Sequence, residues 1–448
     1  MLYRYHSKCL NGGSKILRIK VPSKIHHEIK NDFVRIRINK NIEFLYKISE
    51  EKRFVVPKAL TNKINFLGNN LIEITNIKLL KQQKDETIVK NGKINLIQII
   101  PKKMRSGSPI SILIKGDELI CFCKSFRGAL RKIEIKKGVP LEFCRFLGYY
   151  QAEGGKEKKI NKENGRQVVF TNTNANIIRD FIILSKKVIK EELWNIEIKL
   201  KKRNRKKEEN LKNMLEELGI NKKDIKIKIE RNLRDFSIRL YICSTILSDI
   251  IIGLMETIKD YLIDESTLLT NKSNLKMYVS FIQGLFAGDG NYNAYQNKLG
   301  GVHHRLIFYE EDYNYALQYK KLLEKAGIGS KIIKIKNKNL FIVRATLNWE
   351  LLLLIKELEL FDYHKSHGAS LKKFIKIHKS YRSHKHLVYL GDNIDIERIQ
   401  ELIKKERVIC YNWIKKMVDR GVMIKKDRGL WKLSEKGERI KKVLSKIV

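Results

Sequence analysis

The sequence predicts an α+β protein with two similar αββαββα modules, a β-rich N-terminal domain and a C-terminal winged helix-turn-helix. Three observations lead to this prediction. Strand-like alternation dominates residues 1–140, and an order of apolar helices and hairpins occurs twice between residues 141 and 376. Residues 388–448 then show helical periodicity on both sides of a single predicted hairpin. We therefore expect four domains, which span residues 1–140, 141–265, 266–387 and 388–448.

The charge balance indicates a polyanionic partner. Lys and Arg number 92 and Asp and Glu number 49, which leaves a net charge of +43. Such an excess is greater than solubility requires, and it favours nucleic acid over an anionic membrane surface. Hydrophobic residues make up 43% of the chain, which is enough to build a packed core.

Membrane insertion and secretion are not indicated. The longest apolar helix, over residues 242–255, is interrupted by Asp249, and residues 1–5 carry no secretory signal. The six cysteines contain no C-x-x-C pair, so we expect reduced, buried thiols rather than disulfides or a zinc ribbon. These features are typical of a cytoplasmic protein.

Residues 1–140 have the pattern of a β-rich domain. Alternating or β-branched runs predict strands over residues 15–22, 32–38 and 71–74. Asn91 and Gly92 predict a tight turn, and Gly116 divides a predicted hairpin over residues 110–123. No residue pattern in this domain indicates a particular chemistry.

Residues 141–376 contain the two modules. Each begins with an apolar helix that ends in an acidic residue followed by glycine. The first module continues through strands and helices over residues 167–170, 176–189, 196–200, 236–242 and 245–258. The second continues through residues 305–309, 313–326, 331–336, 340–345 and 349–358. Helices that alternate with hairpins, twice over, indicate an internal duplication.

A basic insertion, residues 199–219, lengthens the first module. Seven of the nine residues from 199 to 207 are Lys or Arg, and a charged helical pattern follows. A solvated loop and a phosphate-contacting surface explain such a run equally well. The candidate DNA contacts in the two modules are Lys201, Lys202, Arg203, Arg205, Arg305, Lys334, Lys336 and Arg344.

Residues 388–448 follow the order of a winged helix-turn-helix. Helices are predicted over residues 394–405 and 409–420, followed by a hairpin over 423–433 and a last helix. The apolar stripe of the second helix comprises Cys410, Trp413, Ile414 and Met417. Its polar stripe and the hairpin supply further candidate DNA contacts, Asn412, Lys415, Lys416, Arg420, Lys425, Lys426 and Arg428. A protein-docking module on the same fold is the alternative.

Two helical segments, residues 146–154 and 282–290, place small residues four apart. These residues are Gly148 with Ala152, and Gly284 with Gly288. Residues four apart lie on one face of a helix, so the two helices can pack backbone against backbone. The small residues therefore predict a close helix–helix interface.

Each segment ends in a carboxylate, Glu153 or Asp289, followed by glycine. A carboxylate at a helix C-terminus meets the negative end of the macrodipole, and a repeated violation of this kind indicates a functional site. If the small faces pack, the two acids meet and require a cation between them. Oxygen ligands favour Mg²⁺, with Mn²⁺ as the alternative, and such an ion can activate water for phosphodiester hydrolysis.

The two segments resemble the paired LAGLIDADG motifs of homing endonucleases and related maturases, in the two-motif, single-chain form. The resemblance covers residues 141–376. It implies that the motif helices form the interface between two pseudo-symmetric halves and that Glu153 and Asp289 bind the catalytic metals. It also implies that each half lays a curved sheet into the major groove of DNA.

The resemblance further implies a catalytic role for Lys365, which follows the last helix of the second half, and a water-ordering role for Asn174. The chain departs from the family pattern in three ways. Gln151 and Glu153 stand where the family commonly has Asp, Ala287 replaces the first Asp of the second motif, and the first half has no lysine that matches Lys365.

We therefore expect a site-specific double-strand DNA endonuclease of the intron-homing type that acts as a monomer. The alternative is a non-catalytic nucleic-acid binder on the same scaffold, either an RNA-splicing maturase or a transcriptional regulator. Retention of both acids favours the nuclease, whereas the C-terminal module favours the regulator. The chain has two pairs of histidines close in sequence, His303 with His304 and His364 with His367. A zinc site is not expected at either pair, because no further ligands are evident beside them.

Overall fold

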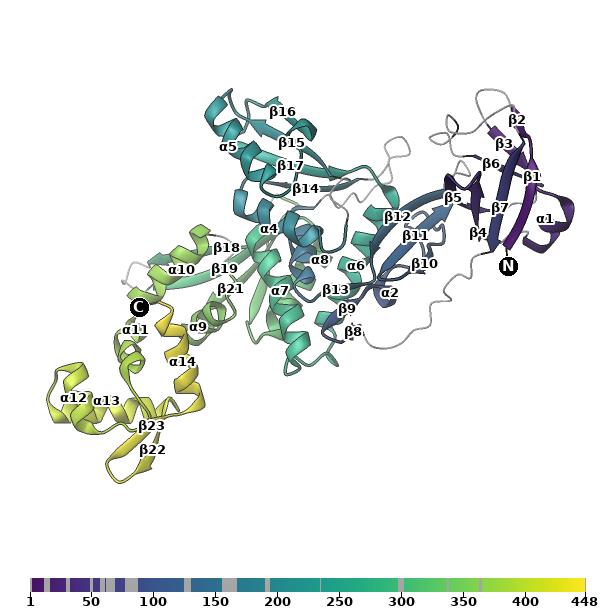
Figure 1. Cartoon of the computed structure of the whole chain (residues 1–448). Coiled ribbons are helices and arrows are strands. Elements are labelled where there is room, and N and C mark those ends of the chain that lie inside the picture. The colour runs from purple at the N-terminus through teal and green to yellow at the C-terminus, as the bar shows by residue number, and fades with distance from the viewer. Residues whose placement is uncertain are drawn as a thin grey trace. The chain divides into compact units, whose positions relative to one another are not determined.

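The computed structural model describes most of the 448 residues (Figure 1). The described residues are 2–11, 17–29, 33–48, 51–56, 61, 69–76, 88–124, 130–154, 167–189, 194–233, 235–296, 302–336, 338–361 and 365–447. They belong to two compact units. Unit 1 comprises Met1–Phe143, Gly155–Thr171 and Ile182–Ile258. Unit 2 comprises Cys144–Gly154, Asn172–Phe181 and Lys259–Val448.

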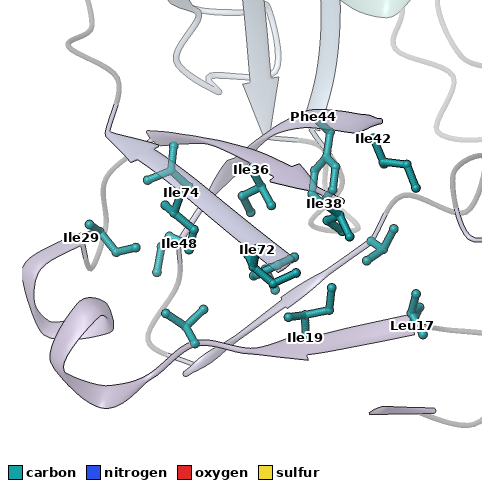
Figure 2. Packing of buried hydrophobic residues seen from close by; sticks show 14 residues of the cluster. Leu17, Ile19, Ile29, Ile36, Ile38, Ile42, Phe44, Ile48, Ile72 and Ile74 are labelled. Atoms are coloured by element: carbon teal, nitrogen blue, oxygen red, sulfur yellow. The ribbon is translucent and has the colours of Figure 1, made fainter. Parts of the chain in front are cut away.

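The N-terminal part of unit 1 is built from two small antiparallel sheets. The larger sheet has the order β1-β7-β4-β5, formed by Leu2–Ser7, Asn70–Asn76, Phe33–Ile38 and Ile42–Lys47. The smaller has the order β2-β3-β6, formed by Cys9–Asn11, Leu17–Lys20 and Arg53–Val55, and helix α1 spans Ser23–Ile29. Alternate residues such as Ile19, Ile36 and Ile72 are buried in one cluster between these strands (Figure 2). The three strands predicted for this region are confirmed.

The segment from residue 88 to residue 140 adds two three-stranded sheets. One has the order β13-β9-β8, formed by Gly138–Pro140, Lys93–Asn95 and Val89–Lys90, with helix α2 at Leu96–Ile99. The other has the order β10-β11-β12, formed by Ser111–Lys115, Glu118–Lys124 and Leu130–Lys136. The predicted turn and hairpin are confirmed, because Asn91 and Gly92 both have positive φ between β8 and β9, and β10 pairs with β11.

An ion pair fixes this segment to helix α6, Thr245–Ile263. The buried carboxylate of Asp249 accepts hydrogen bonds from the backbone N–H of Arg105, at 3.0 Å, and from its guanidinium Nε, at 2.8 Å. One turn further along, a Cβ atom on Gly253 would lie 2.6 Å from Cγ of Pro101. The acid that interrupts the apolar run of α6 therefore serves packing within unit 1.

The first module contains a mixed sheet with the order β14-β17-β15-β16. Its elements are α3 Phe143–Glu153, β14 Val168–Asn172, α4 Ala175–Ser185, β15 Asn195–Leu200, α5 Arg205–Glu216, the short helix η3 Lys222–Asp224, β16 Ile225–Ile229, β17 Phe236–Ile242 and α6. The basic insertion contributes α5 and leads into β16, which pairs parallel to the edge of β15. The insertion is therefore not one solvated loop. Asn204 caps α5 by accepting from the N–H of Lys207.

The second module contains an antiparallel sheet with the order β18-β19-β21-β20. Its elements are α7 Lys272–Gly288, β18 Asn291–Gln296, β19 Val302–Glu310, α8 Tyr313–Lys325, β20 Ser330–Lys334, β21 Phe341–Leu347 and α9 Trp349–Glu357. The two modules share a strand arrangement, β14-β17-β15 in the first and β19-β21-β20 in the second. In both sets of three, the strand that comes third along the chain lies in the sheet between the two that precede it.

The C-terminal part of unit 2 is mainly helical. It comprises α10 Lys365–Ile377, α11 Lys379–His384, η4 Lys385–Tyr389, α12 Ile396–Ile403, α13 Arg407–Asp419, β22 Met423–Asp427, β23 Leu430–Leu433 and α14 Glu435–Ser445. The predicted helices and hairpin of this segment are confirmed. Among the described residues, no helix is both long enough and apolar enough to span a bilayer.

Candidate active site

The two motif helices, α3 and α7, touch through their backbones inside unit 2. A Cβ atom on Gly148 would lie 2.1 Å from the carbonyl oxygen of Phe281, and one on Gly284 would lie 2.2 Å from the carbonyl oxygen of Arg145. Any side chain at these two positions would collide with the backbone of the other helix. The structure thus brings Gly148 and Gly284 together, and glycine is required for this separation of the helices.

The second pair of small residues, Ala152 and Gly288, also lies at the contact between the two helices, directly before the two acids. A Cβ atom on Gly288 would lie 2.3 Å from Cβ of Ala152 and 3.2 Å from Cγ of Glu153. Gly288 is the last residue of α7, and Asp289 caps the helix by donating its backbone N–H to the carbonyl of Leu285. Glu153 is likewise the last residue of α3. Glu153 therefore lies beside the residue that immediately precedes Asp289.

Aromatic packing holds the two helices in place. Phe146, Tyr149 and Tyr150 of α3 are completely buried. The ring of Phe146 stacks on that of Phe181 with centroids 4.6 Å apart, and in α7 the ring of Phe286 lies 5.0 Å from that of Phe308. Each motif helix is therefore fixed to its own module, because movement of either helix would break these ring contacts.

A buried ion pair anchors the first turn of α3. The guanidinium of Arg145 donates two hydrogen bonds to the carboxylate of Asp180 in α4, at 2.6 Å and 2.9 Å. The hydroxyl of Tyr149 donates to the same carboxylate at 2.9 Å. None of these residues was predicted from the sequence to anchor the helix. An arginine within an apolar helical run, three residues before the motif glycine, is the signal that could have identified the first of them.

Asn172, rather than the predicted Asn174, lies beside Glu153. The side-chain amide of Asn172 donates to Oε1 of Glu153 at 3.4 Å, while its oxygen accepts from the backbone N–H of Asn174 at 2.7 Å. This second bond orients the amide so that its NH₂ faces the acid. The Asn174 side chain instead accepts from the N–H of Asn176 at the start of α4. The water-ordering role of Asn174 stays a prediction, and the amide that contacts Glu153 belongs to Asn172.

A buried polar cluster adjoins the second acid. Tyr319 of α8 is completely buried, which raises the pKa of its hydroxyl well above the ordinary value, and the charges of Asp289 and Glu310 raise it further. The side-chain amide of Gln151 donates to this hydroxyl at 3.4 Å. The ammonium of buried Lys259 lies 3.5 Å from the oxygen of Gln151. A buried lysine, a glutamine and a neutral tyrosine therefore form one polar cluster next to Asp289.

The third predicted catalytic residue, Lys365, begins helix α10. Its side chain lies outside the described residues, as do residues 362–364. Its catalytic role therefore stays a prediction.

The predicted contacts in the second module occupy different faces of the sheet. Arg305 lies opposite Thr346 and Arg344 lies opposite Ile307, so both arginines project from one face. Lys334 lies opposite Phe341 on the other face, and its ammonium is 5.9 Å from the centre of that ring. Lys336 is exposed beyond the end of β20. Arg305 and Arg344 thus share a surface that Lys334 does not.

The other predicted contacts are all exposed. In the basic insertion these are Lys201, Lys202, Arg203 and Arg205. In the C-terminal segment they are Asn412, Lys415, Lys416, Arg420, Lys425, Lys426 and Arg428. In α13 the predicted apolar stripe is confirmed, because Cys410, Ile414 and Met417 are buried.

The histidines have structural surroundings. His304 is buried, and its Nδ1 lies 2.8 Å from the hydroxyl of Tyr292. Burial, together with the charges of His378 and His303, lowers the pKa of His304 to about 4. Among the residues that the structure describes, no three His, Cys, Asp or Glu side chains are grouped as a metal site. His364 and the side chain of His367 lie outside the described residues.

The chemistry of the paired acids suits a hard divalent cation. Carboxylate oxygens are the ligands that Mg²⁺ prefers, and this ion commonly binds one or two protein carboxylates together with waters and substrate phosphates. Glu153 and the Asp289 position lie at the same end of a rigid helix pair. Two protein carboxylates are therefore sufficient to bind Mg²⁺ when a phosphodiester and waters supply the remaining oxygen ligands.

Residues 276–403 match the family model of the LAGLIDADG-like domain, and this range contains the second motif. No curated protein matches the chain. One similar solved structure is that of mesophilic variants of the homing endonuclease I-DmoI, which is 16% identical, with 49% of this chain and 88% of that chain covered and a TM-score of 0.26. Another is the N-terminal LAGLIDADG domain of DUF199/WhiA, which is 16% identical, with 51% and 85% covered and a TM-score of 0.28.

A third similar structure is I-DmoI in complex with DNA and Mn, which is 18% identical, with 46% of this chain and 89% of that chain covered and a TM-score of 0.26. At these TM-scores the likeness in three dimensions is partial. The assignment of a LAGLIDADG-like domain to residues 276–403 rests on the family model.

Proposed function

We propose that this chain is a site-specific endonuclease that hydrolyses both strands of double-helical DNA with Mg²⁺ held by Glu153 and Asp289. The observation that carries the proposal is the backbone contact between α3 and α7. This contact leads from Gly148 and Gly284 to Ala152 and Gly288, and so to the two acids. The LAGLIDADG-like domain at residues 276–403 supports it, because the family includes metal-dependent DNA endonucleases.

The proposed chemistry depends on the position of the two carboxylates. A helix C-terminus is electronegative, so each acid needs a cation for compensation. A bound divalent ion would activate the attacking water and stabilise the leaving oxygen. The NH₂ of Asn172 donates to Glu153 and would keep that carboxylate oriented. Packing of Ala152 against Gly288 would hold the acids at a constant separation.

The proposed DNA contacts follow from charge. The chain carries a net charge of +43, and Arg305 and Arg344 project from one face of the β18-β19-β21-β20 sheet. Arginine side chains can contact both phosphates and guanine edges. Because one chain supplies both acids, we propose that it acts as a monomer on a site that need not be palindromic.

A second candidate function is a non-catalytic nucleic-acid binder on the same scaffold, either an RNA-splicing maturase or a transcriptional regulator. The helix–helix–hairpin–helix segment from α12 to α14 and the Glu at position 153 favour this reading. Both candidate functions require nucleic-acid binding. They differ only in whether Glu153 and Asp289 support hydrolysis of the phosphodiester.

Substitution of the acids tests the proposal. Asp289→Asn and Glu153→Gln keep the shape of the side chains and remove the charge that would hold the ion. Each should abolish double-strand cleavage in Mg²⁺ while DNA binding is kept or improved, because a negative charge near the phosphates is lost. The wild-type chain is first tested against a DNA library in Mg²⁺. If it selects a site tightly, never nicks it, and neither substitution alters this behaviour, the non-catalytic reading is correct.

A further inference from the structure

Helix α13 exposes branched apolar side chains next to its polar stripe. Val408 has 69% of its surface exposed and Ile409 has 47%. Val408 has the highest exposed fraction among the large hydrophobic residues in the part of the chain that the structure describes. A single exposed aliphatic residue is ordinary, but two adjacent ones at the start of a helix form a patch that contributes nothing to the core.

The patch belongs to an outward stripe of α13. Val408, Asn412 and Lys415 follow one another at spacings of four and three, so they lie along one side of the helix. All three are exposed, whereas Ile414 and Met417 on the opposite side are buried. Val408 and Asn412 therefore face solvent together, and Ile409 is exposed on the adjoining side of the helix.

Positive charge surrounds this stripe. Lys and Arg outnumber Asp and Glu over residues 404–428, and all of these cations are exposed. The cations on the turn before α13 and at its C-terminal end flank Val408 and Asn412 on both sides. An apolar patch within a cationic frame complements a polyanion that also presents apolar groups. DNA meets both conditions, because thymine places its methyl group in the major groove between two phosphate backbones.

The local fold leaves α13 free to approach such a groove. A short turn joins α12 to α13, with Lys404 in the left-handed conformation at φ 54°. The β22–β23 hairpin follows directly, and Trp431 of β23 bridges to Ile394 ahead of α12. The rings of Tyr411 and Trp431 pack in a T-shape with centroids 6.0 Å apart, which ties α13 to the hairpin. Val408 lies one turn before Tyr411 on the same side of α13, yet its own side chain stays 69% exposed beside this contact.

We propose that α13 enters the major groove and recognises A·T base pairs, with Val408 and Ile409 against thymine methyl groups and Asn412 on an adjacent adenine. This inference rests on the proposed DNA binding of the chain but not on cleavage. Asparagine can bond bidentately to the N6 and N7 of adenine, and a recognition helix contacts bases mainly through its N-terminal residues. Lys415, Lys416 and Arg420 then lie nearer the phosphates.

Removal of thymine methyl groups tests the inference directly. The full-length wild-type chain selects duplexes from a random library in EDTA, so that cleavage cannot intervene. Thymines in the selected site are then replaced one at a time by deoxyuridine, which lacks only the methyl group. At the contacted positions we expect affinity to fall about fourfold per methyl group. Val408→Ala should weaken binding to the thymine site, and deoxyuridine at the same position should then cause no additional loss.

Two further variants make the result specific. Asn412→Ala should lower affinity by roughly tenfold and relax selection at one adenine. Leu268→Ala removes an aliphatic side chain of similar exposure that lies outside the C-terminal segment, and it should leave thymine discrimination unchanged. All of these positions are exposed, so none of the substitutions should affect folding.

The inference is overturned if deoxyuridine is bound as tightly as thymine at every position, or if the chain selects no DNA. It is also overturned if Val408→Ala leaves DNA recognition unchanged and instead abolishes association with a protein. Absence of cleavage in Mg²⁺ contradicts only the proposed nuclease activity. Cleavage that persists without any dependence on thymine methyl groups contradicts only the role of α13.

Discussion

At the scale of single residues, Gly148 determines how closely the two motif helices approach. An added Cβ would lie 2.1 Å from the carbonyl oxygen of Phe281, and that oxygen belongs to a rigid helix. We expect Gly148→Ala to lower the free energy of unfolding by about 1–3 kcal/mol, as overpacking does elsewhere, and to reduce cleavage by displacing the acids. Urea denaturation measures the first effect. Gly329→Ala is the matched control, because a Cβ there meets nothing within 4 Å, and an equal loss in both variants would contradict the argument.

His304 makes the stability of unit 2 depend on pH. Burial lowers its pKa from 6.5 to about 4, so the folded protein keeps the ring neutral where the unfolded chain already binds a proton. The stabilisation is complete above pH 6.5 and is lost as the pH falls towards 4. When the pH is lowered from about 7.5 to about 5, we expect the free energy of unfolding to fall less in His304→Gln than in the wild type. Urea denaturation at the two pH values measures this difference. His303→Gln removes only the smallest of the three causes that lower the pKa of His304, so it should keep most of the wild-type difference in stability.

The polar residues around the acids show what the sequence could not predict. Glu153 and Asp289 were recognisable because each breaks the rule for helix C-termini at the same point of a repeat. Asn172 was not, since its amide faces Glu153 only because the backbone N–H of Asn174 fixes its oxygen. Tyr319 and Lys259 reach the site from helices distant in sequence. Local patterns do not contain such long-range contacts.

At the scale of elements, α3 depends on a buried ion pair that joins it to α4. The carboxylate of Asp180 accepts two bonds from Arg145 and one from Tyr149, and Arg145 also lies 3.5 Å from the side-chain oxygen of Gln283 in α7. Removal of one partner leaves an uncompensated charge away from water. We expect Asp180→Asn to cost about 3 kcal/mol of unfolding free energy.

Tyr149→Phe is the graded control for this ion pair. It removes one neutral donor to Asp180 and keeps the ring packed against Phe181, so we expect a cost of about 1 kcal/mol. Both costs are read from urea denaturation of the full chain. Equal effects of the two substitutions would show that the carboxylate charge is unimportant for the position of α3.

Two strands of the modules that the sequence did not predict, β16 and β18, lie at sheet edges. β16 pairs parallel to β15 and buries only Ile225 of its five residues, and no strand was predicted there. β18 is largely polar, and it forms a strand because β19 pairs with its whole length. The central strands β17, β19 and β21 were predicted, since their apolar residues alternate. Edge strands are defined by their neighbours, and propensity alone does not reveal them.

At the scale of the whole molecule, the charge of +43 should dominate how the chain associates with DNA. The exposed cations lie on separate elements, including the segment before α5 and the surface of α13, and the half-buried Arg305 and Arg344 share one face of β19 and β21. Each phosphate that they neutralise releases condensed counterions, and this release is less favourable at high salt. If six or more phosphates are contacted, affinity should fall at least about a thousandfold between about 50 mM and about 200 mM salt.

Titration of one labelled duplex at several salt concentrations gives the slope of log affinity against log salt, and hence the number of phosphates contacted. A chain in which Lys201, Lys202, Arg203 and Arg205 are replaced by glutamine should show a smaller slope, in proportion to the contacts removed. Replacement of Lys212 and Lys222, which are paired with Glu208 and Glu216, is the control, because cations already neutralised within the protein should contribute little. A slope near zero in the wild-type chain would mean that the excess charge does not serve DNA binding.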